Sequence, residues 1–364
     1  MSLELQNQLK LILKQRKNSP IILDGGLGSE LHRLYQDNKD LEQLLATPLW
    51  SAIILDKDPQ SIQKTHLNYF LAGCDICITS SYQANPSVFK QQGISEQKME
   101  NLFLLTYDLV LESIKQINNP QISQQFDENS NINYKNQNQV NQQEQKKFIA
   151  ISLGPYGAKD GLEYNGDYSE KLQIQDLVEF HKQRLYQILK NPNITNVNSF
   201  LLFETIPNKL EIQAIIQLIN QEKNQSICNQ LTKRLPIMVS VQCQNAEKNA
   251  KGENLIEEIW PLLIKQEQII GIGINCCMPQ YVEEIIQNLK QFLKQNNSEK
   301  FIICYPNSGK IYDIENKKFK PNTGLDPQQF SELTAKWYKA GADIIGGCCG
   351  TTPEYIKEIK NVFK

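Results

Sequence analysis

Residues 199–221 read SFLLFETIPNKLEIQAIIQLINQ, and this stretch decides the fold. Its first part, 199–204, is a continuous apolar run that ends in an acid, which is typical of a strand buried on both faces. After a short Pro-Asn turn, apolar residues recur at helical spacing over 208–221. A buried strand followed at once by an amphipathic helix is the repeating unit of a parallel α/β sheet.

The same unit recurs along the chain. The eight predicted strands are 20–24, 75–80, 148–154, 199–204, 236–243, 269–275, 301–305 and 342–347. The clearest predicted helices are 59–73, 169–189, 208–221, 279–294 and 327–341. Gly73 and Gly341 stand where two of these helices need a C-cap. Eight βα units in a row predict an α/β protein with the TIM (β/α)8 barrel fold and a single domain.

A doubly wound open sheet is the main alternative fold. Such sheets more often have about five to seven strands, and no GxGxxG motif follows the first predicted strand here. The expected barrel domain spans 1–364, with a low-complexity Asn/Gln-rich insertion at about 118–147. This insertion lies between a helix and the next strand, so it belongs to the N-terminal face of the barrel, away from the chemistry.

Composition excludes several classes of protein. The 364 residues carry a formal net charge of −2, which argues against a nucleic-acid or anionic-membrane surface. No apolar run is long enough to cross a membrane, and the N-terminus has the pattern of an amphipathic helix without the features of a signal peptide. We therefore expect a cytoplasmic protein, in which the nine cysteines are not a disulfide framework.

Two pairs of adjacent cysteines follow predicted strands. Cys276 and Cys277 come after the sixth strand, and Cys348 and Cys349 come after the eighth, with glycine on both sides. Both pairs lie at C-terminal strand ends and can face one another across the barrel mouth. Three thiolates with one open position are typical of a catalytic zinc site. Packing, a vicinal disulfide and a redox pair are the alternatives that the residues alone leave open.

The other cysteines are expected to be packing residues: Cys74, Cys77, Cys228, Cys243 and Cys304. The three histidines, His32, His66 and His181, fall in helical patterns and are expected on the surface or in the core. A histidine metal site and a catalytic triad therefore find little support.

Two acids end apolar strands, Asp24 in the first and Glu204 in the fourth. A carboxylate at the end of a buried strand must meet water, a cation or a ligand, because burying it bare is costly. Both lie on the rim that carries the thiols, where they can hold a substrate ammonium group. Helix capping or a rim salt bridge is the plainer interpretation of either acid alone.

Aromatic residues crowd the same predicted rim. They are Trp50, Tyr82, Tyr156, Tyr164, Tyr168 and Tyr305. Loop packing explains most of them, and the functional alternative is a pocket that takes a cationic ligand by cation–π contact.

Motifs along nearly the whole chain resemble those of the homocysteine S-methyltransferases. They are DGGLGSEL (24–31), PLWSA (48–52), SSYQAN (80–85), GPYG (154–157), FETIPN (203–208), GINCC (273–277), YPNSG (305–309) and GGCCGTTPEYI (346–356). The resemblance implies a TIM barrel with one zinc ion, Zn2+, held by Cys276, Cys348 and Cys349. It also implies that Asp24 and Glu204 bind the amino group of homocysteine and that Thr79 lies near its carboxylate. Ile78 departs from the pattern, since the family often has a second threonine there.

The resemblance implies that zinc-activated homocysteine attacks a methyl group on a sulfonium donor and becomes methionine, with no further catalytic residue. The motif wording favours S-methylmethionine or S-adenosylmethionine as donor. Betaine is an alternative donor, although the betaine-using relatives differ in wording and have a longer C-terminal arm. A non-catalytic zinc or thiol redox sensor, with a Cys348–Cys349 disulfide, is the alternative from another class. The expected partners are small molecules, and the chain is expected to act as a monomer.

Overall fold

The computed structural model describes residues 2–16, 18–36, 51–119, 146–195, 198–221, 235–310, 312–313, 318–320 and 323–364. Trp50, Cys228 and residues 120–145 of the predicted insertion lie outside these ranges. No helix within them combines the length and the apolar character that crossing a bilayer requires.

Eight parallel strands form the centre of the molecule. They are β1 (Ile21–Ile22), β2 (Ile76–Ile78), β3 (Phe148–Leu153), β4 (Ser199–Ile206), β5 (Ile237–Val241), β6 (Ile269–Asn275), β7 (Phe301–Tyr305) and β10 (Ile344–Ile345). Their order is β1-β10-β7-β6-β5-β4-β3-β2. A parallel bridge between Leu23 and Ile76 joins the first and last strands of that order, which closes the barrel. The TIM barrel and all eight strands are confirmed.

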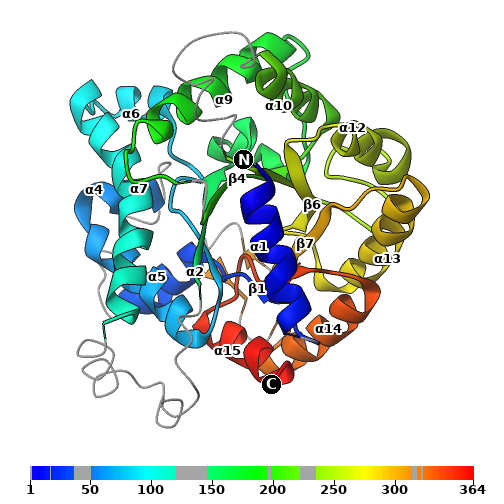
Figure 1. Ribbon diagram of the computed structural model, residues 1–364. Coiled ribbons are helices and arrows are strands. Elements are labelled where there is room, and N and C mark those ends of the chain that lie inside the picture. Colours follow the sequence, from blue (N-terminus) through cyan, green and yellow to red (C-terminus); the bar gives the residue numbers. More distant parts are fainter. Residues whose placement is uncertain are drawn as a thin grey trace.

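Helices surround the barrel, as Figure 1 shows. They are α1 (Ser2–Gln15), α2 (Leu27–Tyr35), α4 (Ser51–Lys57), α5 (Pro59–Ala72), α6 (Pro86–Gln91), α7 (Glu96–Ile117), α9 (Ile174–Leu189), α10 (Lys209–Gln221), α12 (Trp260–Ile264), α13 (Pro279–Gln295), α14 (Pro327–Ala340) and α15 (Pro353–Val362). Helices α5 and α14 end on Gly73 and Gly341 in the left-handed region, as predicted.

Three local features differ from the sequence-based expectation. Helix α9 begins at Ile174 and not at residue 169, because Asp176 accepts a hydrogen bond from the backbone N–H of Gln173 and so caps the helix there. A π-helical turn at Leu255–Ile259 leads into α12, and β8 (Tyr312–Asp313) pairs in antiparallel fashion with β9 (Lys318–Phe319). The last two have no clear periodic signal, because each is only a few residues long.

Side chains alternate between two apolar layers along each strand. In β3, Phe148 and Ala150 point into the barrel, while Ile149, Ile151 and Leu153 pack against the outer helices. Both layers consist of buried apolar side chains, which explains why the strands are continuous apolar runs.

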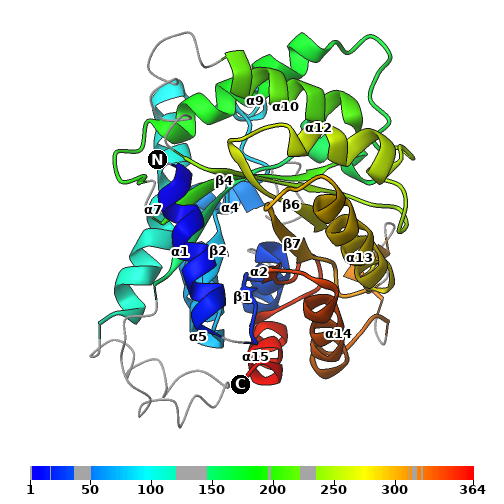
Figure 2. The ribbon, with the colours of Figure 1, turned by 45° about the vertical axis from the view of Figure 1, so that its right-hand side comes forward.

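Helix α1 covers the N-terminal end of the barrel. Leu5 and Leu9 are fully buried and belong to the interior cluster, where they join residues from the strand starts such as Phe148 and Phe301. Figures 1 and 2 show α1 crossing this end. With that end covered, polar chemistry has room only at the opposite end, where the strands finish.

Candidate active site

Three cysteines meet at the C-terminal ends of β6 and β10. The Sγ atoms of Cys276, Cys348 and Cys349 all lie within 4.8 Å of one another. Cys276 and Cys348 are joined in a disulfide, and the Sγ atoms of Cys276 and Cys349 are 3.9 Å apart. The expectation that the two cysteine pairs meet at the mouth is confirmed for Cys276, Cys348 and Cys349, but Cys277 is not part of the cluster, and the two strands lie on either side of β7. The disulfide joins the two strands, whereas the redox hypothesis predicted a bond between the neighbours Cys348 and Cys349.

The backbone is shaped to bring these thiols together. Cys276 has a φ of 50°, in the left-handed region that non-glycine residues rarely adopt. Its N–H donates to the carbonyl of Tyr305 at 3.2 Å, and the N–H of Cys348 donates to the carbonyl of Pro306 at 2.8 Å. Gly350 turns the chain after the second pair at a φ of 81°. Both cysteine loops are therefore tied to the end of β7, which lies between their strands.

Gly26 explains why a glycine pair follows the first strand. A Cβ atom on Gly26 would lie 2.6 Å from the carbonyl oxygen of Cys348, closer than any side chain tolerates. The loop after β1 can therefore lie directly against the cysteine loop only because Gly26 has no side chain.

These three thiols suit a thiophilic metal ion. Tetrahedral coordination at a metal–sulfur distance near 2.3 Å separates the sulfurs by about 3.8 Å, close to the 3.9 Å between Cys276 and Cys349. Cys276 and Cys348 become available as thiolates once the disulfide is reduced. Burial raises the pKa of the Cys349 thiol to about 11, and the charge of Glu163 adds to this effect. A bound cation would reverse that shift.

Cys277 has a different environment from its neighbour. It is buried in the outer apolar layer, and burial raises the pKa of its thiol to about 12. Cys243, whose charge would interact with Cys277, and Cys304 are buried in the same layer. The expectation that Cys243 and Cys304 are packing residues is confirmed.

Glu204 lies inside the mouth near the end of β4. The hydroxyl of Ser152 donates a short hydrogen bond to its Oε1 atom, and the hydroxyl of Tyr305 donates to Oε2 at 3.2 Å. Burial raises the pKa of Glu204 to about 7, although both hydrogen bonds oppose the shift. Tyr305 links this carboxylate to the thiol site, because its hydroxyl binds Glu204 and its carbonyl accepts from the N–H of Cys276.

Asp24 is buried where the barrel closes between β1 and β2. Its Oδ2 atom accepts from the N–H of Ile78 at 2.8 Å, while Oδ1 has no hydrogen-bond partner within the described ranges. Burial raises its pKa well above the usual value, and the negative charge of Glu204 raises it further. Ile78, where the family pattern often has threonine, therefore contributes its backbone to the site.

Behind Asp24, on the helix side of the wall, lie His66 and Cys77. One ligand atom from each of the three residues lies within 4.8 Å of the others. Burial lowers the pKa of His66 to about 3, so its ring is neutral. Cys77 in turn contacts Cys74, with 3.6 Å between the Sγ atoms. The sequence treated these cysteines as packing residues, and it gave no reason to connect them with Asp24.

Thr79 follows β2 and is buried. Its hydroxyl accepts from the N–H of Ser152 at 3.0 Å and lies 2.7 Å from the Ser81 hydroxyl. The same Ser152 binds Glu204 through its side chain. Thr79 and Glu204 are thus linked through one serine, although 125 positions separate them in the sequence.

Asn275 is the main residue that the sequence analysis missed. Its Oδ1 atom accepts from the N–H of Thr205 at 2.8 Å and from the Ser240 hydroxyl at 2.8 Å, while its Nδ2 group donates to the Thr205 hydroxyl at 2.7 Å. Thr205 has a φ of 60°, so Asn275 holds two strained strand ends, its own and that of β4. The sequence could have indicated this role, because Asn275 is a polar residue at the end of a buried apolar strand, directly before Cys276.

The rim aromatics have two different roles. Tyr156 and Tyr168 pack edge to face, with ring centroids 5.5 Å apart, and Tyr168 donates to the buried Glu211 at 2.5 Å. Tyr82 packs at the end of β3 instead, where a Cβ atom on Gly154 would lie 2.7 Å from its ring, and the interaction of Tyr164 with Cys349 lowers the pKa of that thiol.

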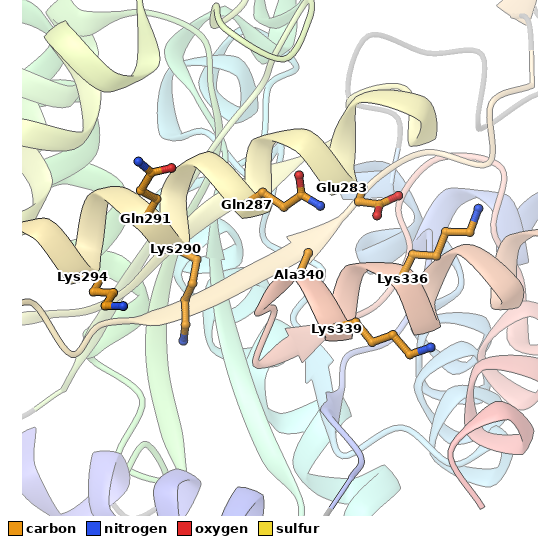
Figure 3. Close-up of a pocket in the computed structure, with 8 residues that line it drawn as sticks. All are labelled: Glu283, Gln287, Lys290, Gln291, Lys294, Lys336, Lys339 and Ala340. Carbon is orange, nitrogen blue, oxygen red and sulfur yellow. The ribbon is translucent and has the colours of Figure 1, made fainter.

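A separate groove lies on the outer surface, between α13 and α14. Figure 3 shows its lysines, Lys290 and Lys294 from one helix and Lys336 and Lys339 from the other. It contains no sulfur or unpaired buried acid, so it has no part in the chemistry of the mouth.

Fold and site together define the class of this protein. It is a TIM-barrel enzyme with a thiol cluster and buried carboxylates at the C-terminal mouth, where enzymes of this fold have their active sites. The family model for homocysteine S-methyltransferase matches residues 21–363. The chain belongs to the homocysteine S-methyltransferase family, whose enzymes transfer a methyl group to homocysteine.

Individual relatives align with this chain over nearly their whole length. Homocysteine S-methyltransferase 1 of Arabidopsis thaliana is 33% identical over 367 residues, covering 100% of this chain and 99% of the relative. Selenocysteine methyltransferase of Astragalus bisulcatus is 33% identical and covers 94% and 92%. The metallated form of the homocysteine methyltransferase MmuM from Escherichia coli superimposes with a TM-score of 0.71 at 27% identity, covering 97% and 99%. An oxidized form of MmuM is equally similar, with a TM-score of 0.71.

Proposed function

We propose that this enzyme uses a zinc ion, held by Cys276, Cys348 and Cys349, to methylate homocysteine from a sulfonium donor. The donor is S-methylmethionine or S-adenosylmethionine, and the product is methionine. The observation that carries the proposal is the meeting of three thiols at the end of the barrel that also holds the buried Glu204, to which Tyr305 joins them through its hydroxyl and its carbonyl. The metallated form of MmuM adds support, since that relative binds a metal.

Zinc in such a site lowers the pKa of a coordinated thiol, so that the sulfur is a thiolate at neutral pH. The protein residues supply the rest by positioning. Asp24 and Glu204 are both buried and carry no bound cation of their own, which suits them to hold the homocysteine ammonium group. Thr79 stands at the end of β2 to bind the amino-acid carboxylate. Together they aim the homocysteine sulfur at the donor.

The bond changes balance without a general acid. A new bond forms between the homocysteine sulfur and the methyl carbon, while the bond from that carbon to the donor sulfur breaks. The electron pair of the broken bond stays on the donor sulfur, which leaves as a neutral sulfide. The thiol proton of homocysteine passes to solvent. A histidine at the rim is therefore unnecessary, and His66 and His181 are buried outside the mouth.

The hydrogen bonds to Glu204 give it a fixed direction. Ser152 and Tyr305 each donate to a different oxygen of this carboxylate. Fixed carboxylate oxygens bind an ammonium group without the entropy loss of ordering a mobile side chain. We infer that Ser152 and Tyr305 position Glu204 and do not react themselves.

The proposal also covers the setting of the enzyme. The site needs reduced cysteines, and a reducing cytoplasm supplies that condition. We expect a monomer that acts on small molecules, without a nucleic-acid or membrane partner.

One experiment tests the proposal directly. Protein purified with a reductant is assayed for zinc per chain and for methionine formed from homocysteine and S-methylmethionine, with S-adenosylmethionine and betaine as other donors. One zinc per chain and turnover with either sulfonium donor is expected. Turnover with betaine alone would replace the donor assignment, and turnover in protein that lacks zinc would overturn the metal assignment.

A further inference from the structure

Glu163 is a buried acid at the mouth that the proposed reaction has not used. It lies in the short helix η2 (Leu162–Tyr164), in the loop after β3, and its side chain is only 6% exposed. Its Oε2 atom has no hydrogen-bond partner among the described residues. Burial raises the pKa of Glu163 to about 7, and the charges of Asp160 and Glu211 raise it further. A buried acid of this kind is costly unless it meets a cation.

Glu163 lies at the same end of the barrel as the thiols, because its loop follows the C-terminal end of β3. Its charge raises the pKa of Cys349 and, after burial, is the largest cause of the raised pKa of Tyr82. The next residue, Tyr164, is 56% exposed, and its interaction with Cys349 lowers the pKa of that thiol. The ring of Tyr82 lies at the start of the same loop, because a Cβ atom on Gly154 would come within 2.7 Å of it. Glu163, Tyr82 and Tyr164 therefore belong to one side of the mouth, around the end of β3.

Arg184 is a buried cation beside Tyr82, and backbone carbonyls already accept its hydrogen bonds. The guanidinium of Arg184 donates to the carbonyls of Ala84, Gly154, Ser81 and Tyr82 at 2.5–3.0 Å. These hydrogen bonds hold the loops after β2 and β3 in place, and none of them is made to Glu163. A cationic ligand would supply the charge that Glu163 lacks.

The acids at the mouth can be assigned to the positive charges of the two substrates. Asp24 and Glu204 are assigned to the homocysteine ammonium group, which leaves Glu163 for the second substrate. A sulfonium donor carries a positive charge on the sulfur next to the methyl group that is transferred, and that charge disappears when the methyl group leaves. A carboxylate with two aromatic neighbours is a chemical match for such a cation.

We propose that Glu163, with Tyr82 and Tyr164, forms the subsite that binds the sulfonium cation of the methyl donor. The inference rests on the proposed function, because it assumes a sulfonium donor. It adds a kinetic consequence. The positive charge is full in the bound donor and partly lost in the transition state, so Glu163 stabilises the bound donor at least as much as the transition state. Its removal should raise the KM of the donor and leave kcat unchanged or slightly higher.

The test compares Glu163→Gln with Glu170→Gln, a matched substitution of an exposed acid in the same loop. Steady-state kinetics are measured in zinc-loaded, reduced enzyme with S-methylmethionine and homocysteine. Glu163→Gln should raise the donor KM about 10- to 100-fold, the range for losing a contact to a charged group. The KM of homocysteine, the zinc content and the melting temperature should stay near those of the parent. Glu170→Gln should change none of these values.

A binding measurement keeps the inference separate from the proposed reaction. Calorimetry without homocysteine compares S-methylmethionine with methionine, which has the same chain but a neutral sulfur. The parent should prefer the sulfonium, Glu163→Gln should lose that preference, and Glu163→Asp, which keeps the charge, should restore part of it. An unchanged preference in Glu163→Gln would overturn the role of Glu163 while leaving methyl transfer intact. A parent that binds both compounds equally would also overturn it, whereas preference without turnover would count only against the proposed donor.

Discussion

Buried acids occur at both ends of this barrel, and the two ends treat them in opposite ways. At the N-terminal end, Asp75 accepts two hydrogen bonds from Arg16, at 2.5 and 2.7 Å, and one from the N–H of Ile22 at 2.8 Å. Burial alone would raise the pKa of Asp75, but Arg16 holds it below its usual range. At the mouth, burial raises the pKa values of Asp24 and Glu204, and the charge of Arg184 opposes the shift of Glu204 without cancelling it.

This difference separates stability from function. The charge of Asp75 is neutralised within the chain, so folding gains from it. The charges at the mouth are costly in the free protein and become favourable only when a ligand brings a cation. Substitutions at the two ends should therefore have opposite effects on stability and on activity.

The largest effect is expected at the thiols. Cys348→Ala should lose bound zinc and at least about 10³-fold in methionine formation, because two sulfurs cannot replace a three-ligand site. Cys277→Ala is the matched control, since Cys277 is adjacent to Cys276 but packs in the outer apolar layer. Zinc per chain is measured by mass spectrometry alongside turnover. Full zinc occupancy in Cys348→Ala would contradict the ligand assignment.

The next effect tests the N-terminal end. Asp75→Asn should lower the free energy of unfolding by about 3 kcal/mol, because it leaves Arg16 without its partner in a largely buried site. The kinetic constants should not change. Urea denaturation measures the loss, and Glu299→Gln, which removes an exposed ion pair with Lys10, should leave the midpoint unchanged. A comparable loss of kcat in Asp75→Asn would contradict the conclusion that this end of the barrel contributes to stability and not to activity.

Glu204→Gln is the counterpart at the mouth. It should lower kcat/KM for homocysteine about 100-fold, because the ammonium group loses a charged partner. Zinc should stay bound and the melting temperature should not fall, since a neutral amide is easier to bury than a carboxylate. Thermal melts and steady-state kinetics on the same preparation measure both values. A large drop in melting temperature would show that Glu204 serves the fold.

The smallest effect is a pH dependence of opposite sign at the two ends. Glu204 has a pKa near 7 in the folded protein and a usual value near 4.5, so the folded state binds more protons between these values. Stability of the metal-free, reduced protein should therefore fall as pH rises through this window, by on the order of 1 kcal/mol, and Glu204→Gln should flatten the slope. Asp75 has a lowered pKa, so its contribution is lost only as pH falls below about 4. Denaturation midpoints from about pH 2 to 8 would measure both slopes, and a midpoint that rises from pH 4.5 to 7 would contradict the assignment to Glu204.

The sequence was sufficient to predict the barrel because each strand is a separate apolar run. Residues 199–206, for example, are buried at every position, so neither face needs a polar side chain. The rim positions of Asp24, Glu204, Cys276 and Cys348 followed from the same pattern, since each stands where a predicted strand ends. Their functional roles came from the resemblance and are still predictions.

Contacts between distant residues were beyond reach of the sequence. Asn275 binds Thr205 across the mouth, and nothing in either motif specifies that pair. The burial of Glu163 depends on how three loops fold against one another, and its own stretch, GLEYNGDY, is polar enough to predict an exposed loop. The link between Cys276 and Cys348 likewise requires the geometry of the closed barrel.

The buried leucines of helix α1 have one further consequence, which concerns how substrates and products reach and leave the active site. Because Leu5 and Leu9 fill the N-terminal end of the barrel, the axis is a dead end and not a tunnel. Homocysteine, the methyl donor and both products must then enter and leave through the mouth. A product that dissociates slowly from the mouth prevents the next substrate from binding, so the order of substrate binding and product release affects the turnover rate.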